Sequence, residues 1–320
     1  MARASAPPDT ASVDIATADL ADADVTREAE RRVEVFAVFG PTASGKSAVA
    51  EAAATRLGTE VVSVDALQVY RGLPILTNQP AAHTRLVGIR SPEEQMTVGE
   101  FAPLAHAAID ALVTAHGAAI VTGGTGLYLR AALTDLELPP AVDEATLARA
   151  EQAVAEDAGA AHARLAERDA AAAAAVHPND RQRLVRALAL SESGASLART
   201  VDRLWSAETR RPTLVVGLVL SKDALERRIQ ERTRLMFASG VVDEVRAALG
   251  QPLSRTVEKT LGLREIASLD PDEALERVLI RTRRYARYQE KWMRRIPGIV
   301  LVDGERDPEA IASDIVERGR

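Results

Sequence analysis

One short string restricts this chain more than any other. Residues 40–47 read GPTASGKS and match the pattern G-x-x-x-x-G-K-[ST]. A buried-strand pattern precedes the string at 33–39, and helical spacing follows it at about 46–57. The defining positions are occupied by Gly40, Gly45, Lys46 and Ser47. Glycines allow close approach of the backbone to a phosphate, while the N–H groups and the lysine attract it. The string therefore predicts a phosphate-binding P-loop.

The composition excludes several kinds of site. Of the 320 residues, 47% are hydrophobic and 27% charged, and the net charge is −6, as in an ordinary globular protein. Without cysteine there is no disulfide, cysteine-ligated zinc, iron–sulfur cluster or thiol nucleophile. No apolar run approaches the roughly 18 residues of a membrane span, and the acidic N-terminus lacks a signal peptide's apolar core. We therefore expect a cytoplasmic monomer that binds no membrane.

The pattern of the chain divides it into three parts. Residues 1–32 are rich in Ala, Asp and Thr, which predicts a disordered tail. At 33–136 and 208–320, strand and helix patterns alternate, which predicts an α/β fold with a P-loop nucleoside-triphosphate-hydrolase-like parallel sheet core. Only helical patterns occur at 137–207, so we expect an inserted all-helical subdomain. We expect strands at 33–39, 59–65, 118–124, 212–220 and 298–303.

Capping residues set the expected helix ends. A helix is expected from residue 98 to a stop at Gly117, and a long helix after Ser221. In the helical part, Ser, Asp and Asn positions suggest N-caps and glycines suggest stops. The expected N-caps are Asp143, Asn179 and Ser196, and the expected stops are Gly159 and Gly194.

An acidic residue follows the second expected strand rather than the third. ATPases and GTPases hold Mg²⁺ with an acid at the end of an adjacent strand, but the strand at 118–124 ends in Thr-Gly-Gly. Asp65 ends the strand at 59–65, where an open parallel sheet presents its crevice. A carboxylate there can hold a substrate that comes to the phosphates. The alternative is that Asp65 only caps the turn that follows.

Two helices carry arginines at helical spacing. In the first, Arg228 and Arg232 suggest a second anion-binding group, although a solvated charged face is the alternative. The second helix, at 281–295, has seven basic residues, one acid and interleaved aromatics, a pattern that suits phosphate backbones and unstacked bases. Its recurring positions are Arg281, Arg284, Tyr288 and Arg295.

Taken in order, six stretches of the chain resemble the tRNA dimethylallyltransferases (tRNA isopentenyltransferases). The resemblance covers essentially everything after Val33, and the ordered set is far more specific than any one stretch. The stretches are GPTASGKS (40–47), SVDALQVYRGL (63–73), VTGGTGLYLRAAL (121–133), HPNDRQRLVRALAL (177–190), RTRLMFASGVVDEV (232–245) and TRRYARYQEKWMR (282–294).

The resemblance implies a reaction and a set of roles. Dimethylallyl diphosphate would give its dimethylallyl group to the exocyclic amine of the tRNA adenosine next to the anticodon, at position 37. Asp65 would be the general base, Arg232 and Lys46 would contact the leaving pyrophosphate, and Ser47 would ligate Mg²⁺. The diphosphate would lie on Gly40, Pro41, Thr42, Ala43, Ser44, Gly45, Lys46 and Ser47. The tRNA anticodon stem-loop would contact Asp65, Ala66, Leu67, Gln68, Thr125, Gln182, Arg183, Leu184, Val185 and Arg186, and the inserted helices would grip it.

Some positions depart from the family's usual text, and other functions remain open. The departures spare the phosphate loop and Asp65 and concern mainly tRNA-facing elements. The alternatives are an adenylate isopentenyltransferase acting on free nucleotide, a P-loop kinase of a small metabolite, and an RNA-binding protein with a vestigial P-loop. The departures fall at 74–79, Thr84, Gly88, Leu147, Leu263 and Tyr288.

Overall fold

The computed structural model describes residues 32–81, 83–198 and 203–320. All that follows concerns the compact unit formed by residues 33–320. Apart from Arg32, the tail expected to be disordered lies outside the described residues. None of the helices described could cross a membrane, because none is both long and apolar enough.

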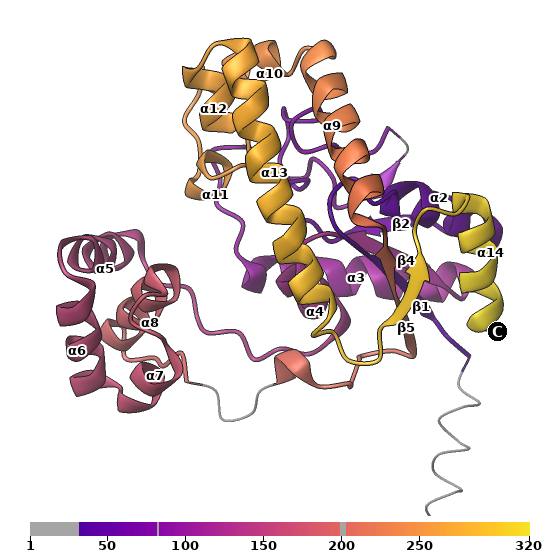
Figure 1. The fold of residues 1–320 in the computed structure, drawn as a ribbon. Helices are drawn as coiled ribbons and strands as arrows, with labels where there is room; N and C mark the ends of the chain where they lie inside the picture. Colours follow the sequence, from indigo (N-terminus) through magenta and orange to yellow (C-terminus); the bar gives the residue numbers. More distant parts are fainter. Residues whose placement is uncertain (1–31, 82, 199–202) are drawn as a thin grey trace, which may run out of the picture. The chain divides into compact units, whose positions relative to one another are not determined.

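A six-stranded parallel sheet forms the core, which confirms the expected α/β class (Figure 1). Its strand order is β3-β2-β4-β1-β5-β6. The five expected strands are present, each somewhat shorter than its pattern. The two-residue β3 was not predicted, because two residues are too short for an alternating pattern. The strands are β1 (Val35–Phe39), β2 (Val61–Ser63), β3 (Thr84–Arg85), β4 (Ala119–Gly123), β5 (Thr213–Val219) and β6 (Val300–Asp303).

Strand β1 shows how the sheet acquires two covered faces. All five of its residues are buried, and successive side chains point to opposite sides. Val35 and Phe39 belong to one hydrophobic cluster, with side chains from α3 (Val98–His116), α4 (Gly126–Leu133) and α13 (Pro271–Met293). Phe36 and Val38 belong to another, with α2 (Lys46–Leu57) and α14 (Pro308–Arg318). Burial on both faces explains why β1 is a continuous apolar run.

The caps predicted for two core helices, Gly117 and Ser221, are confirmed. Thr97 forms a capping box with Glu100 at the start of α3, and Gly117 ends that helix in a left-handed conformation. Ser221 caps the helix after β5 by accepting the Ala224 N–H. The helix after β5 is α9 (Lys222–Ala238), and the remaining core helices are α10 (Val241–Ala248), α11 (Arg255–Glu258) and α12 (Leu263–Ser268).

Between α4 and β5 the described residues contain only helices. Buried side chains from α5 to α8 form their own hydrophobic cluster. These elements are α5 (Glu144–Glu156), α6 (Ala158–Arg168), α7 (Ala170–Ala175), α8 (Arg181–Glu192) and the 3₁₀ helix η1 (Arg203–Trp205).

Two of the expected caps in this region are correct and three are wrong. Asp143 caps α5 and Gly194 follows α8 with a positive φ, as expected. Neighbouring residues take the places of Asn179 and Gly159, whereas no described helix begins after Ser196. Asp180, not Asn179, caps α8; Asp157 separates α5 from α6, so Gly159 lies inside α6; and Ser196 accepts the Ala198 N–H in a turn.

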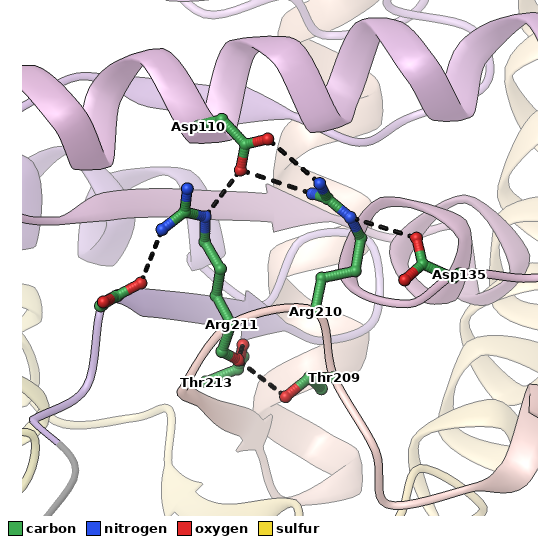
Figure 2. Close-up of polar contacts among 7 residues, drawn as sticks. Asp110, Asp135, Thr209, Arg210, Arg211 and Thr213 are labelled. Atoms are coloured by element: carbon green, nitrogen blue, oxygen red, sulfur yellow. Dashed lines mark hydrogen bonds and ion pairs between the residues drawn. The ribbon is translucent and has the colours of Figure 1, made fainter.

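A charged cluster joins the two chain segments that flank α5–α8 (Figure 2). The Arg210 guanidinium pairs with Asp110 of α3 at 3.1 Å and with Asp135 at 3.2 Å. The backbone N–H of Arg210 donates to the Leu133 carbonyl at 2.8 Å. Arg211 pairs with the same Asp110 at 2.6 Å. The segment leaving α4 and the segment entering β5 are therefore both fastened to α3.

Candidate active site

The carboxyl ends of three strands meet at one edge of the sheet. Phe39 lies opposite Gly123 and Ser63 opposite Thr122, so the residues that follow these strands come together. A pocket of about 110 Å³ lies there. Its polar lining includes Thr42, Lys46, Ser47, Asp65, Arg232 and Gln289.

The phosphate loop has the tight backbone that its sequence predicts. Ala43 and Gly45 both have positive φ, 65° and 91°, immediately before α2 begins. A Cβ at Gly40 would lie 2.7 Å from the Ser44 Oγ, so a side chain there would require a shift. The loop therefore places Lys46 and Ser47 in the pocket at the N-terminus of α2, where the helix dipole and the free N–H groups favour an anion.

The two arginines expected on one face of α9 have different positions. The Arg232 guanidinium lines the pocket and donates to the Thr42 hydroxyl. Arg228 donates to the carbonyls of Ser44 and Gly304, at 3.0 and 3.1 Å, and so supports the loop from behind. Only Arg232 is placed to touch a ligand in this pocket.

Two buried cations give the pocket its electrostatic character. Burial, followed by the charge of Arg232, lowers the pKa of Lys46 to about 8, and Asp65 only partly opposes this. Burial likewise lowers the pKa of Arg232, again against the attraction of Asp65. Two cations held out of water and close together provide a strong site for a polyanion.

Asp65 takes part in a turn and also lines the pocket. Its Oδ1 accepts the Leu67 N–H at 3.0 Å, the turn-capping contact that the sequence left open as an alternative. The same carboxylate faces Lys46 and Arg232 across the pocket. The turn therefore fixes the position of the carboxylate.

Gln289 of α13 joins the phosphate loop to the turn after β4. Its side chain is buried; its Oε1 accepts the Thr42 N–H at 2.7 Å, and its Nε2 donates to the Gly124 carbonyl at 2.8 Å. Gly124 leaves room for this contact, because a Cβ there would overlap the Gln289 amide. One side chain thus sets the relative position of the loops after β1 and β4.

A larger cavity of about 1370 Å³ lies beside the first. Leu67 and Tyr285 line both cavities and therefore lie at the boundary between them. Burial and the charge of Asp65 raise the pKa of Tyr285, so its hydroxyl stays protonated at neutral pH. Among the expected tRNA-contacting residues, those lining the larger cavity are Ala66, Leu67, Gln182, Val185 and Arg186.

The other expected tRNA contacts lie elsewhere. Gln68 lines the small pocket, and its amide is engaged by the Ser63 hydroxyl and the Asn78 carbonyl. Leu184 is buried in the cluster of α5–α8, whereas Arg183 is exposed on α8. Thr125 is the residue before α4 and interacts with Tyr285.

The expected basic strip on α13 is partly used within the protein. Arg281 pairs with Glu265, and Arg283 pairs with Glu226. The Arg295 guanidinium lies 3.9 Å from the centre of the Trp205 ring. The sequence pattern could not reveal these partners, which come from other elements.

Comparisons with known proteins agree with this architecture. Family models match the chain at residues 68–296 (IPP transferase) and 33–90 (isopentenyl transferase). A tRNA dimethylallyltransferase from Anaeromyxobacter dehalogenans (strain 2CP-C) is 41% identical over 301 residues, covering 88% of this chain and 98% of the relative. The chain belongs to the tRNA dimethylallyltransferase family. Another member, from Rhodococcus jostii (strain RHA1), is 38% identical over 289 residues, covering 86% and 92% of the two chains.

Solved structures of family members have the same fold. The full-length tRNA isopentenylpyrophosphate transferase from Bacillus halodurans matches with a TM-score of 0.64 and 28% identity, over 89% of this chain and 96% of that one. A eukaryotic dimethylallyltransferase acting on tRNA matches with a TM-score of 0.68 over 85% and 74%; its 22% identity supports likeness of fold alone.

One face of α13 lines the pocket, although none of its residues is among the expected site residues. Val278, Thr282, Tyr285 and Gln289 all line it. They stand at i, i+4, i+7 and i+11, the spacing of one helix face. That spacing is present in the sequence, but the arginines that suggested nucleic-acid binding lie on the adjacent face of the helix.

Proposed function

We propose that this chain transfers the dimethylallyl group of dimethylallyl diphosphate to the exocyclic N6 amine of the adenosine at position 37 of tRNA, releasing pyrophosphate. One observation carries the proposal. A phosphate loop, two buried cations and the Asp65 carboxylate line a small pocket, and Leu67 and Tyr285 line both this pocket and a larger cavity. Family membership supports the same reaction.

The residues at the phosphate loop suit the departure of pyrophosphate. The C1–O bond of the donor breaks, and its electron pair leaves with the diphosphate. Lys46, Arg232 and the N–H groups at the start of α2 stabilise the charge that grows on that group. Because these groups are buried, their electrostatic effect is stronger than it would be in water.

Asp65 suits the other half of the step. The adenine N6 attacks C1 as the C–O bond breaks, and the amine becomes acidic only as the new bond forms. A carboxylate can accept a proton from that species, although not from the free amine, which is a very weak acid. The contact with Leu67 holds the Asp65 oxygens at the pocket wall while the proton transfers.

Magnesium fits this pocket as a partner of the diphosphate. The described part of the chain has no cluster of three or more His, Cys, Asp or Glu side chains that could hold a metal ion. Mg²⁺ needs few protein ligands when phosphate and water oxygens supply the rest. The Ser47 hydroxyl would hold it together with the diphosphate oxygens, and the ion would neutralise diphosphate charge.

The larger cavity is the proposed place for the anticodon stem-loop. Ala66, Leu67, Gln182, Val185 and Arg186 line it from both the sheet core and α8. A target base in a single-stranded loop can turn out of its stack and pass between Leu67 and Tyr285. A free nucleotide needs no such second cavity, which favours tRNA over AMP as the acceptor.

Labelled donor distinguishes the candidate functions. The protein is incubated with dimethylallyl diphosphate labelled in the allyl group, together with tRNA, AMP and ATP. We expect label on tRNA only, at the adenosine next to the anticodon, and equimolar pyrophosphate. Label on AMP alone would identify an adenylate isopentenyltransferase, and phosphate transfer from ATP a kinase; either result would overturn the proposal.

A further inference from the structure

The pocket changes from polar to apolar with distance from the phosphate loop. On α13, Gln289 contacts Thr42, whereas Val278 lies 11 residues earlier on the same face, about 16 Å along the helix axis. On α9, Arg232 contacts Thr42 and Met236 follows one turn later. Both helices therefore present charged or amide groups at the diphosphate end and hydrocarbon at the other.

Leu76 and Val278 close the apolar end. They come from chain segments some 200 residues apart, and both line the pocket and are buried. They meet at Gly262: a Cβ built there would lie 3.2 Å from the Leu76 Cδ1 and 3.3 Å from the Val278 Cγ2. The glycine has a φ of 95°, so its backbone packs directly behind the two side chains.

A half-buried carboxylate fixes Leu76 in this position. The Glu244 oxygens of α10 accept the backbone N–H groups of Ile75 and Leu76, at 2.8 and 2.7 Å. Hydrogen bonds to the backbone, and not packing alone, therefore set the position of Leu76. Ile75 and Leu76 belong to the stretch at 74–79 where the chain departs from the family's usual text.

We propose that Leu76 and Val278 form an end wall that limits the donor to a five-carbon prenyl chain. The inference rests on the proposed function and specifies its donor. A ten-carbon donor extends about 5 Å further, given C–C bonds of about 1.5 Å. With its diphosphate on the loop, that chain must displace Leu76 or Val278, which Gly262 and Glu244 hold from behind.

Donor competition tests the wall. Wild type, Val278→Ala and Leu76→Ala are assayed with tRNA and either dimethylallyl or geranyl diphosphate. For each variant we expect the geranyl-to-dimethylallyl ratio of kcat/KM to rise at least 10-fold, because removing methyl groups from a hydrophobic pocket changes selectivity on this scale. The converse variant, Val278→Ile, adds a methylene group and should raise the KM for dimethylallyl diphosphate while leaving the KM for tRNA unchanged.

Matched controls separate the wall from general loosening. Leu279→Ala truncates the next residue of α13, which packs in a different cluster, and Leu73→Ala removes a buried side chain near Leu76 outside the pocket lining. Neither should change donor selectivity. If either truncation at the wall fails to fold, Val278→Ile still tests the site.

The outcomes distinguish this inference from the function on which it rests. Wild-type enzyme that transfers no dimethylallyl group overturns the proposed function. Wild-type enzyme that transfers it, with folded wall variants that still exclude geranyl diphosphate, overturns the wall. Equal selectivity changes in Leu279→Ala or Leu73→Ala would also overturn it.

Discussion

The amide of Gln289 accepts the backbone N–H of Thr42 at 2.7 Å, although 247 residues separate the two in the chain. The bond is buried, and the same amide donates to the Gly124 carbonyl. Gln289 therefore determines how the phosphate loop sits against the turn after β4. Its effect on the reaction acts through Thr42 and Gly124, which makes it a positioning residue.

Gln289→Met keeps the length of the side chain and removes both hydrogen bonds. We expect kcat/KM for dimethylallyl diphosphate to fall by up to about 30- to 1000-fold, since two buried backbone groups lose their partner at about 1–2 kcal/mol each. The loss should appear in the donor KM and in kcat, with the KM for tRNA unchanged. Gln230→Met in α9 removes an amide that binds only Glu226 among the contacts described, so it should leave the kinetics unaltered. Equal kinetics for Gln289→Met and wild type would show that the contact is dispensable.

One conservative change separates the two roles of Asp65, its turn contact and its proposed action as a base. In Asp65→Asn the amide oxygen can still accept the Leu67 N–H, but the side chain cannot take a proton. We expect kcat to fall about 10²- to 10⁴-fold, the range for loss of a general base, with tRNA affinity unchanged. Single-turnover kinetics and tRNA binding measure the two effects separately.

The comparison with Asp65→Ala completes this test. Alanine removes the turn contact as well, so this variant should also lower the melting temperature. Near-normal transfer by Asp65→Asn combined with loss in Asp65→Ala would assign the residue to the turn alone, as the alternative interpretation has it.

Local sequence signals predicted the parts of the site that follow strands. The P-loop and Asp65 each come directly after a strand, and the carboxyl ends of parallel strands meet by geometry alone. The expected sheet and most caps are confirmed for the same reason: they depend on residues close in sequence.

What the sequence could not resolve depends on contacts between distant segments or on competition between neighbours. Arg228 and Arg232 have equivalent spacing, and only the packed fold distinguishes the one that supports Ser44 from the one that enters the pocket. Arg281 pairs with Glu265 of another helix, which no helical pattern announces. At the start of α8, Asn179 and Asp180 are both good caps, and sequence alone could not decide between them.

The cluster around Asp110 predicts a pH-dependent contribution to stability (Figure 2). Burial opposes ionisation of Asp110, but hydrogen bonds from Arg210 and Arg211 outweigh it and hold the pKa below its ordinary value. A lowered carboxyl pKa stabilises the fold above the unfolded pKa of about 3.9 and loses this effect as pH falls toward the folded value. Asp110→Asn should therefore lower the melting temperature at pH 7 by a few degrees, and the difference should shrink below about pH 4. A difference independent of pH would show that charge is not responsible. Asp243→Asn, which breaks an exposed pair with Arg246, should change little.

Lys46 should make donor binding sensitive to mildly alkaline pH. Burial and Arg232 lower its pKa to about 8, so the free enzyme loses this charge as pH rises through that value. At the proposed diphosphate site the protonated amine binds the donor, so the affinity for dimethylallyl diphosphate should fall above about pH 8. Lys46→Arg keeps its charge throughout and should show no such decline, whatever its affinity at neutral pH. Calorimetric titration with dimethylallyl diphosphate from pH 6.5 to 9.5 measures this; parallel profiles for the two proteins would contradict the assignment.

The same lowered pKa implies that Lys46 destabilises the empty fold. Between about pH 8 and its ordinary value of 10.5, the unfolded chain holds more protons than the native chain, so stability rises with pH across this window. Below pH 8 the full penalty is present. Lys46→Met, which places no charge in the pocket, should raise the free energy of unfolding at pH 7 by on the order of 2–3 kcal/mol. Denaturant unfolding at pH 7 and pH 10 tests the sign, because the advantage of the variant must shrink at the higher pH. A variant less stable than wild type at pH 7 would show that the buried ammonium is compensated in the empty pocket.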